Sequence, residues 1–352
     1  MTNPFKRRRP RCHFFATMFF ALCAAMLPVA AAAQQEVGTA ETFEAIRAAD
    51  LQLARIGYRI ATANAELCEQ LEPGTGLQLH SLDLYDGAMR SRAEAHFGFA
   101  TDLAIEAVVP RSPAEAAGLQ ADDSLVRIGP VVIAGTSGRP NSTERLVQVQ
   151  LALAELPPEA PIEVEALRDG VPIRATILPV PRCRSRFELR LANDLNASAD
   201  GTMVQLSSRY LEDFPEEFVA ATVAHELSHN ILRHRVRLEA RGVSWGLLSG
   251  FGGNVKYFRQ TEVEADLLAV SLLVNAGYDA ETMVRFWSHF GPRHAGGILR
   301  SRTHPSWRDR VATVRQEALR VAAISTRPVR PPILEARNRP LDGDWQSLLV
   351  RD

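Results

Sequence analysis

The stretch that most constrains this chain is VAATVAHELSHNILRHR, residues 219–235, which places His-Glu-Leu-Ser-His inside an otherwise apolar segment. On a helix, His225 and His229 are four residues apart and share one face, so both imidazoles can reach a single metal ion. Glu226 can reach an attacking water, accept its proton and later pass that proton to the leaving amine. Two histidines and a glutamate buried among apolar side chains would be costly without a metal. The pattern therefore predicts a zinc site that cuts peptide bonds; the alternative is a structural histidine pair.

The flanking residues predict where this helix begins and ends. Asp213 and Glu216 form a capping-box-like pair, and Pro215 lies in the first turn. Gly242 lies beyond the end. We therefore expect a helix between these signals.

A second predicted helix, RQTEVEADLLAVSLLVNAGYD at residues 259–279, offers a third ligand. Glu262 and Asp266 are four residues apart and lie on one face, whereas Glu264 points elsewhere. A catalytic zinc takes two histidines, one glutamate and an open position, and a ligating histidine takes a carboxylate behind its other ring nitrogen. Glu262 as ligand and Asp266 as that supporting carboxylate would meet both needs. We expect Glu264 to be a solvated surface charge.

Three motifs in this order, HELSH, TEVEAD and RTHPSWRDRV, resemble the HtpX and BepA group of zinc metallopeptidases, which is peptidase family M48 of the gluzincins. The resemblance covers about residues 196–310. It implies a mainly helical domain with a small sheet whose edge strand lies along the cleft. The site residues that it implies are one Zn²⁺ per chain bound by His225, His229 and Glu262, with Glu226 as general base and Asp266 as a supporting residue.

Two further segments take their expected roles from the resemblance. NASADGTMVQLSS is similar to the strand along the family's cleft, with Asn196 and Ala197 at its start, where backbone hydrogen bonds would hold an extended substrate. His304, in THPSWRDR, matches a late histidine–proline pair. Three roles are open to it: a regulatory fourth ligand that holds the enzyme shut, a transition-state donor, or a loop residue. The remaining histidines of this region, His234, His289 and His294, are expected to be structural.

Residues 83–182 resemble a PDZ domain. The resemblance rests on VVPRSPAEAAGLQADDSLVRIGP, with its strand, short helix and following strand, and on Phe97-Gly98-Phe99, where the carboxylate-binding loop of that family lies. PDZ domains add an extended peptide as a strand and bind its terminal carboxylate. The resemblance implies a groove for protein C-termini between the strand after Phe97 and the helix at 143–156. The alternative is a module that only braces its neighbour. The lone histidines His80 and His96 are expected at the surface.

The first 33 residues are predicted to be a secretory signal peptide. A basic start, MTNPFKRRRPR, precedes an apolar run and an alanine-rich site for cleavage after Ala33. An uncleaved membrane anchor is the alternative, because residues 14–33 are nearly long enough to span a bilayer. Cys68 and Cys183 are the cysteines beyond this segment, and in an exported chain they suggest one disulfide, with two free thiols as the alternative. We therefore expect a periplasmic or secreted protein.

The chain of 352 residues suggests two or three domains, and its composition, 46% hydrophobic and 23% charged, is that of a globular protein. We predict an α+β protein in which a PDZ-like β-rich domain precedes a mainly helical metallopeptidase domain. The predicted parts are a signal peptide at 1–33, a helical segment at 34–82, the PDZ-like domain at 83–182, the metallopeptidase domain at 183–325, and an extended or disordered Pro/Arg-rich tail at 326–352.

The predicted function is that of a zinc metalloendopeptidase acting on unfolded or damaged cell-envelope proteins. A PDZ adaptor or holdase with a latent or structural zinc site is the alternative, and a prenyl-protein protease is a weaker one. The glycine-rich run at 242–253 is expected to be a lid or a shallow membrane-touching loop. Protein or peptide substrates are the expected partners, with at most peripheral membrane contact. Since the net charge is −1, no basic field argues for nucleic acid.

Overall fold

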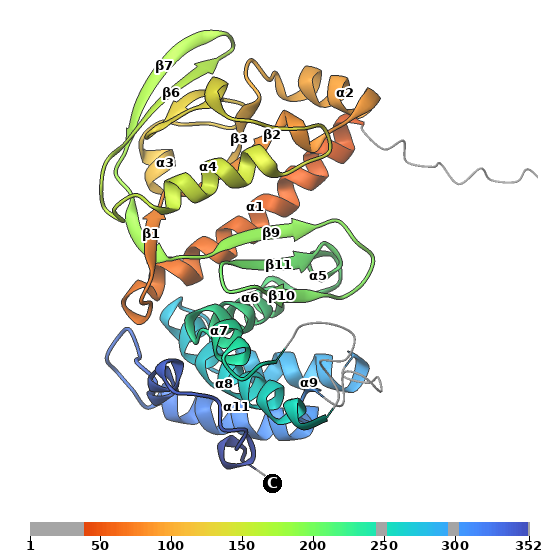
Figure 1. Cartoon of the computed structure of the whole chain (residues 1–352), viewed down its shortest axis with the longest axis vertical. Coiled ribbons are helices and arrows are strands. Elements are labelled where there is room, and N and C mark those ends of the chain that lie inside the picture. The colour runs from red at the N-terminus through yellow and green to blue at the C-terminus, as the bar shows by residue number, and fades with distance from the viewer. Residues whose placement is uncertain (1–38, 244–251, 295–302, 351–352) are drawn as a thin grey trace, which may run out of the picture. The chain divides into compact units, whose positions relative to one another are not determined.

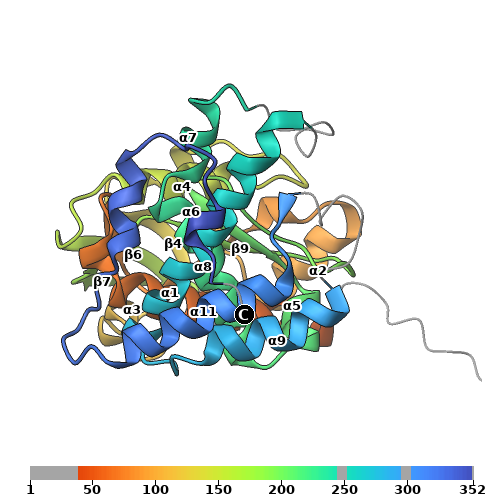
Figure 2. The same cartoon turned by 90° about the horizontal axis from the view of Figure 1, so that it is seen from below.

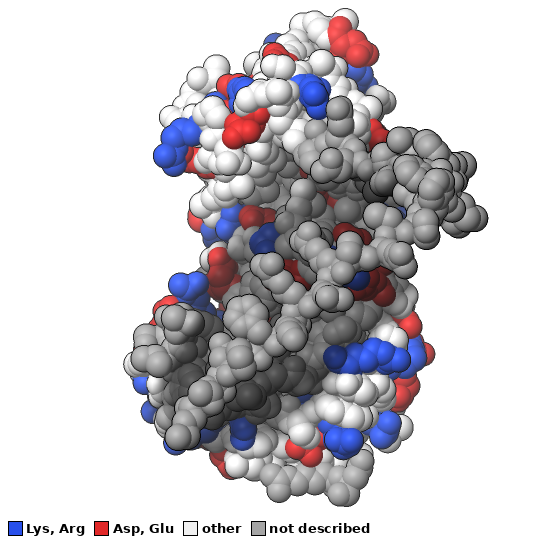
Figure 3. All heavy atoms as spheres, turned by 90° about the vertical axis from the view of Figure 1, so that its right-hand side faces the viewer, with Lys and Arg blue, Asp and Glu red and all other residues white. Residues whose placement is uncertain are grey.

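The computed structural model describes residues 39–243, 252–294 and 303–350. The predicted signal peptide and most of the glycine-rich run at 242–253 lie outside these residues. In the described part of the chain, no helix is long and apolar enough to cross a membrane. On the face drawn in Figure 3, basic and acidic side chains are interspersed over the described surface, so this face presents no field of a single sign.

The first described element is the long helix α1, Ala40–Ala63, which confirms the helix predicted in this segment. The side chain of Thr39 accepts a hydrogen bond from the amide of Thr42 at its start. A short 3₁₀ turn, Ala65–Leu67, follows. β-Structure then begins within the segment predicted to be helical, at β1 (Leu71–Gly74) and β2 (Leu77–Ser81). Runs of four and five residues are too short to show a clear alternation in sequence.

The largest sheet has the strand order β2-β3-β4-β6-β7, with the short strand β5 paired to β4. Its further strands are β3 (Leu103–Val108), β4 (Ser124–Ile128), β5 (Val131–Val132), β6 (Ile162–Arg168) and β7 (Val171–Ile177). The helices that accompany it are α2 (Gly87–Phe97), α3 (Pro113–Ala116) and α4 (Glu144–Ala154). The hairpin predicted at Asp169-Gly170 joins β6 to β7, and both turn residues have positive φ, as a two-residue turn of this kind requires.

A three-stranded sheet lies between α1 and the helical part of the chain (Figure 1). It consists of β9 (Arg186–Arg190), β11 (Met203–Ser207) and β10 (Ala197–Ala199). β11 is central and runs parallel to β9 and antiparallel to β10, so β10 is an edge strand. β8 (Val180–Cys183) precedes this sheet and pairs with β1.

The helical part has α5 (Arg209–Asp213), α6 (Glu216–Ile231), α7 (His234–Glu239), α8 (Val255–Asn275), α9 (Thr282–His294) and α11 (Trp307–Ala322). α11 packs against α8 and α9, and all three are seen from below in Figure 2. The predicted capping box is wrong: Asp213 closes α5, and Pro215 is the N-cap of α6 without a side-chain bond. The predicted helix is also interrupted, because Arg233 has a φ of 56° and separates α6 from α7.

The C-terminal segment is predicted to be extended or disordered, but it contains two 3₁₀ helices, Pro332–Asn338 and Gln346–Leu348, and it is packed against the helices. Val329, Leu334 and Leu341 are at most 1% exposed. The amide of Val350 donates to Oγ1 of Thr313 on α11. Burial of these apolar side chains explains why a stretch rich in proline and arginine is held in one place.

The predicted disulfide joins Cys68 to Cys183, whose Cα atoms are 5.4 Å apart. It ties the segment after α1 to β8 and closes a loop with a sequence separation of 115 residues. In the chain-entropy account, a loop of this length stabilises the folded state by about 4–5 kcal/mol.

Two acidic side chains lie where α1 meets the largest sheet, Asp50 on α1 and Glu106 on β3. Burial and mutual repulsion raise the pKa of Glu106 well above its usual range, and burial raises the pKa of Asp50 to about 7. A carboxyl whose pKa is raised on folding favours the folded state below its unfolded pKa of about 4. That contribution is lost as the pH rises through about 7.

Replacing Asp50 by asparagine is therefore expected to stabilise the protein at pH 8 by about 1–3 kcal/mol, because it removes the charge that burial disfavours. At pH 5 the gain should be much smaller. Denaturant unfolding of both proteins at the two pH values measures the difference. An equal effect at both values would contradict this account, and Glu41→Gln, an exposed change on the same helix, is the matched control.

Candidate metal centre

The predicted ligands converge from two helices. His225 and His229 lie on α6, one turn apart, and Glu262 lies on α8, which packs against α6. Nε2 of His225 is 3.2 Å from Nε2 of His229. The carboxylate oxygens of Glu262 lie 3.4 Å from the first of these nitrogens and 3.6 Å from the second. In the described part of the chain, these three residues form the one group whose ligand atoms lie within 4.8 Å of one another.

These separations fit a zinc ion. Ligand atoms bound to zinc at 2.0–2.2 Å in a tetrahedron are roughly 3.3–3.6 Å apart. The three observed distances lie in or next to that range, and the donor set of two imidazoles and one carboxylate is that of a catalytic zinc site. The residues present therefore fit the ion that the motif predicts.

Asp266 lies behind His225, as predicted. Its Oδ1 is 3.1 Å from Nδ1 of His225, although the ring N–H is not aligned with it, so the contact is an ion pair rather than a hydrogen bond. Asp266 also accepts hydrogen bonds from Nε and Nη2 of Arg310, at 2.6 and 2.8 Å, and from the indole of Trp287 at 3.1 Å. Arg310 in turn lies 3.4 Å from Glu262 and 3.6 Å above the Trp287 ring. One buried guanidinium thus fixes both carboxylates.

The electrostatics of the site suit a cation. Burial would lower the pKa of His225, but Asp266 and Glu262 outweigh it and raise that pKa to about 10. Burial holds the pKa of His229 well below its ordinary value. Burial would raise the pKa of Glu262, but His304 and the paired histidines hold it well below the usual range. A metal ion that binds here would therefore displace a proton from His225.

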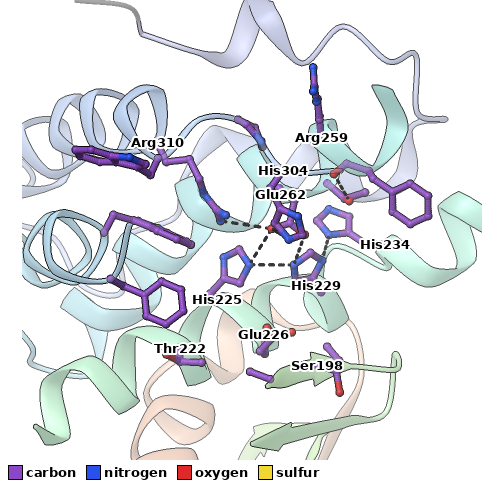
Figure 4. Close-up of a pocket in the computed structure, with 18 of the residues that line it drawn as sticks. Ser198, Thr222, His225, Glu226, His229, His234, Arg259, Glu262, His304 and Arg310 are labelled. Carbon is purple, nitrogen blue, oxygen red and sulfur yellow. Dashed lines mark hydrogen bonds and ion pairs between the residues drawn. The ribbon is translucent and has the colours of Figure 1, made fainter. Parts of the chain in front are cut away.

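Glu226 and the edge strand line the same cleft, which has a volume of about 740 Å³. Glu226 lies on α6 between the histidine pair and Ser198 of β10 (Figure 4). The predicted substrate-binding residues Asn196 and Ala197 also line this cleft. In the described part of the chain, β10 pairs only with β11, so its outer edge is open to an extended peptide.

His304 lies in the cleft beside Glu262 (Figure 4). Its Nε2 is 3.3 Å from Oε2 of Glu262, and its Nδ1 is 2.9 Å from the hydroxyl of Thr303. It is not part of the compact group of three ligands. His304 therefore faces the metal centre. Its role as a fourth ligand, a transition-state donor or a loop residue stays a prediction.

The prediction for Glu264 is wrong. Glu264 is not a solvated charge: it is 1% exposed and accepts hydrogen bonds from His234, Arg237 and Gln260. His234, predicted to be structural, is buried, and its Nδ1 is 2.9 Å from Nδ1 of His229. The spacing placed Glu264 correctly on the opposite face of its helix, but that face is covered by α7. His289 and His294 contact aromatic side chains such as Phe214, as expected of structural residues.

The groove predicted beside Phe97-Gly98-Phe99 does not form. Phe97 ends α2 and is 2% exposed, Phe99 is 8% exposed, and both belong to a small apolar cluster. Gly98 is the left-handed residue that ends α2. The strand after this segment, β3, is bonded to β2 and β4 and therefore has no free edge. His80 in β2, predicted at the surface, is fully buried against Phe97 and Phe99.

A groove smaller than the cleft at the metal centre lies instead between the edge strand β2 and α4. Its volume is about 90 Å³. Leu77 of β2, Gln150 of α4 and Phe187 of β9 are among the residues that line it. In the described part of the chain, β2 is the strand at this edge of the sheet, and it precedes α2 in the chain. The elements predicted within this region, from β3 through α3 to β4, are present in the expected order.

Four residues at the site are not predicted from the sequence: Arg310, Trp287, Arg237 and Gln260. Arg310 lies six residues after His304 in the motif RTHPSWRDRV, and its place in that motif is the one signal that indicates a role at the site. The other three come from separate helices, and nothing in the sequence indicates which faces these helices turn to the metal centre.

The fold and this centre define a candidate zinc metallopeptidase. The model of peptidase family M48 matches residues 243–318. The matched stretch contains Glu262, Asp266, His304 and Arg310, and it begins after the helix that carries the paired histidines. This match supports a metallopeptidase of that family, whose members are typically zinc-dependent. No curated protein matches the chain.

Proposed function

We propose that this chain is an exported zinc-dependent endopeptidase that cleaves unfolded or damaged proteins of the cell envelope. The observation that carries the proposal is the set of three ligand atoms at tetrahedral spacing on the wall of a cleft of about 740 Å³, with Glu226 beside them. A structural metal site has no use for a carboxylate in that place.

The mechanism assigns each residue a task. Zinc held by His225, His229 and Glu262 would supply Lewis acidity, which activates water and polarises the scissile carbonyl. Glu226 accepts the proton of the attacking water and returns it to the leaving amine. Asp266 and Arg310 keep the ligand side chains in place before substrate arrives, so little reorganisation is needed in the transition state.

The edge strand favours unfolded substrates. A peptide bound along β10 must be extended, because its backbone groups pair with those of the strand. Segments inside a folded protein are already paired and cannot do this, whereas damaged proteins expose such segments. Backbone pairing also depends little on side chains, which suits broad specificity.

The location in the envelope has two supports. The N-terminal 33 residues have the pattern of a signal peptide, and the disulfide between Cys68 and Cys183 is typical of oxidising compartments. We propose a periplasmic or secreted enzyme on this basis, with an N-terminal anchor as the alternative.

The PDZ-like region would capture substrates or control access to the cleft. The groove between β2 and α4 supports capture at the edge of β2 rather than β3, with an extended protein C-terminus as ligand. A free edge beside a helix is what strand addition requires. The alternative function is that of an adaptor or holdase. Such a protein would bind a peptide in the same groove but would not cleave it.

Metal removal tests the proposed enzyme. The purified protein is expected to cleave unfolded casein, to lose that activity in a chelator, and to regain it when zinc is restored. Casein cleavage followed by gel electrophoresis, with zinc content measured in parallel, gives the result. Cleavage that survives loss of the metal would contradict the proposal. A protein that holds one zinc yet never cleaves would favour the adaptor.

A further inference from the structure

A buried polar cluster lies on the far side of His229 from the other ligands. It consists of His234 and Arg237 on α7 and Gln260 and Glu264 on α8, each at most 6% exposed. Nδ1 of His234 is 2.9 Å from Nδ1 of His229, and Nε2 of His234 is 3.0 Å from Oε2 of Glu264. Figure 4 shows the His234 ring beside the His229 ring. The cluster therefore reaches the metal centre through one histidine.

Glu264 is held as a carboxylate acceptor. Arg237 donates to both of its oxygens, at 2.5 and 3.2 Å, and the amide of Gln260 donates to Oε1 at 2.9 Å. Gln260 is itself fixed, because its Oε1 accepts from the amide of Gly343 at 2.8 Å. Nε of Arg237 donates to the carbonyl of Arg339. The C-terminal segment thus closes the cluster on its outer side.

This arrangement determines which ring nitrogens carry protons. A carboxylate can only accept, so the proton of neutral His234 lies on Nε2 and its Nδ1 has a lone pair. That lone pair accepts the N–H of Nδ1 of His229. Nε2 of His229 is then unprotonated, and it is this nitrogen that faces His225 and Glu262. A metal ligand needs such a lone pair.

The contact depends on the break between α6 and α7. On a continuous helix, residues five apart point about 140° away from each other, so His234 could not face His229. Arg233, in the left-handed region at a φ of 56°, redirects the chain before His234. A non-glycine residue there is strained, and the strain is tolerated where the surrounding structure fixes it.

We propose that Glu264 and His234 are positioning residues that hold His229 in its metal-binding tautomer. The two ligand histidines are thus supported differently: Asp266 contacts His225 directly, whereas Glu264 acts on His229 through a second imidazole. The inference rests on the proposed function only in that a metal binds at the three ligands, and it requires no catalysis.

Zinc affinity of His234 variants tests this inference. His234→Leu removes both hydrogen bonds and keeps an apolar side chain, and we expect it to weaken zinc binding about 10–100-fold. In His234→Gln the amide can donate to Glu264 while its oxygen accepts from His229, so this variant should bind zinc more tightly than the leucine variant. Competition with a coloured chelator measures each dissociation constant. Glu239→Gln, an exposed change on the same helix, should bind zinc as the unaltered protein does.

The outcomes separate the two proposals. Equal zinc affinity in the unaltered protein and His234→Leu would overturn the positioning role while leaving the metallopeptidase proposal intact. Equal weakening by leucine and glutamine would also overturn it, because a packing role does not distinguish a hydrogen-bonding side chain. Failure of the unaltered protein to bind zinc would reject the proposed function itself. Glu264→Leu adds a second test, because leucine cannot accept from His234; the same loss is expected, and thermal unfolding of the metal-free protein shows whether the variant folds.

Discussion

Glu226→Gln is expected to lower casein cleavage by about 10²–10⁴-fold while one zinc per chain stays bound. Glutamine has nearly the same shape as glutamate but cannot accept a proton from water, so the change removes general-base catalysis. The ligands His225, His229 and Glu262 are untouched, and their supporting contacts are on other side chains. Initial rates and zinc content of the same preparation measure the two effects.

The control for this change lies on the same helix. Glu217 is half-buried in the first turn of α6, and its carboxylate pairs with Arg285 at 2.8 Å in a solvent-exposed interaction that contributes little. Glu217→Gln should retain the full rate. If Glu226→Gln kept the full rate, another group would have to be the base. If it lost its zinc, the lower rate would say nothing about proton transfer.

The residues that bind the metal could be predicted because their spacing is a property of one helix. His225 and His229, and likewise Glu262 and Asp266, are four residues apart, and a helix places such pairs on one face. Which face of α8 meets solvent is a different question, since it depends on α7. The break at Arg233 that positions α7 has no glycine or proline to mark it, and Glu264 was therefore assigned to the surface.

The region predicted to be PDZ-like shows the same limit. The helices and strands after Phe99 could be predicted from local patterns, and the hairpin at Asp169-Gly170 from its turn residues. The edge strand could not, because strand order is set by pairing between distant segments. β2 lies at the edge of the sheet although α2 separates it from β3 in the chain. The observed groove is therefore beside β2, a strand that the sequence pattern does not predict.

Arg310→Ala is expected to lower the free energy of unfolding by about 3–5 kcal/mol, because it removes the buried guanidinium that donates two hydrogen bonds to the Asp266 carboxylate. Asp266 is 1% exposed and Arg310 is 3% exposed, and two hydrogen bonds join them. The guanidinium also packs over Trp287, so its removal costs apolar contact as well. Denaturant unfolding of the metal-free protein measures this effect without any contribution from zinc.

Asp266→Asn with Arg310→Met shows whether the loss comes from the unpaired charge. Replacing both charged partners removes the buried carboxylate that has lost its guanidinium, so the double variant should be more stable than Arg310→Ala. Arg308→Ala on the same helix, an exposed change, should alter stability by less than about 0.5 kcal/mol. A loss below about 1 kcal/mol in Arg310→Ala would mean that water reaches Asp266 and takes the place of the guanidinium. The inference that Arg310 fixes Asp266 and Glu262 beside the metal centre would then be wrong. Water could hydrogen-bond to the Asp266 carboxylate and keep it ionised without Arg310.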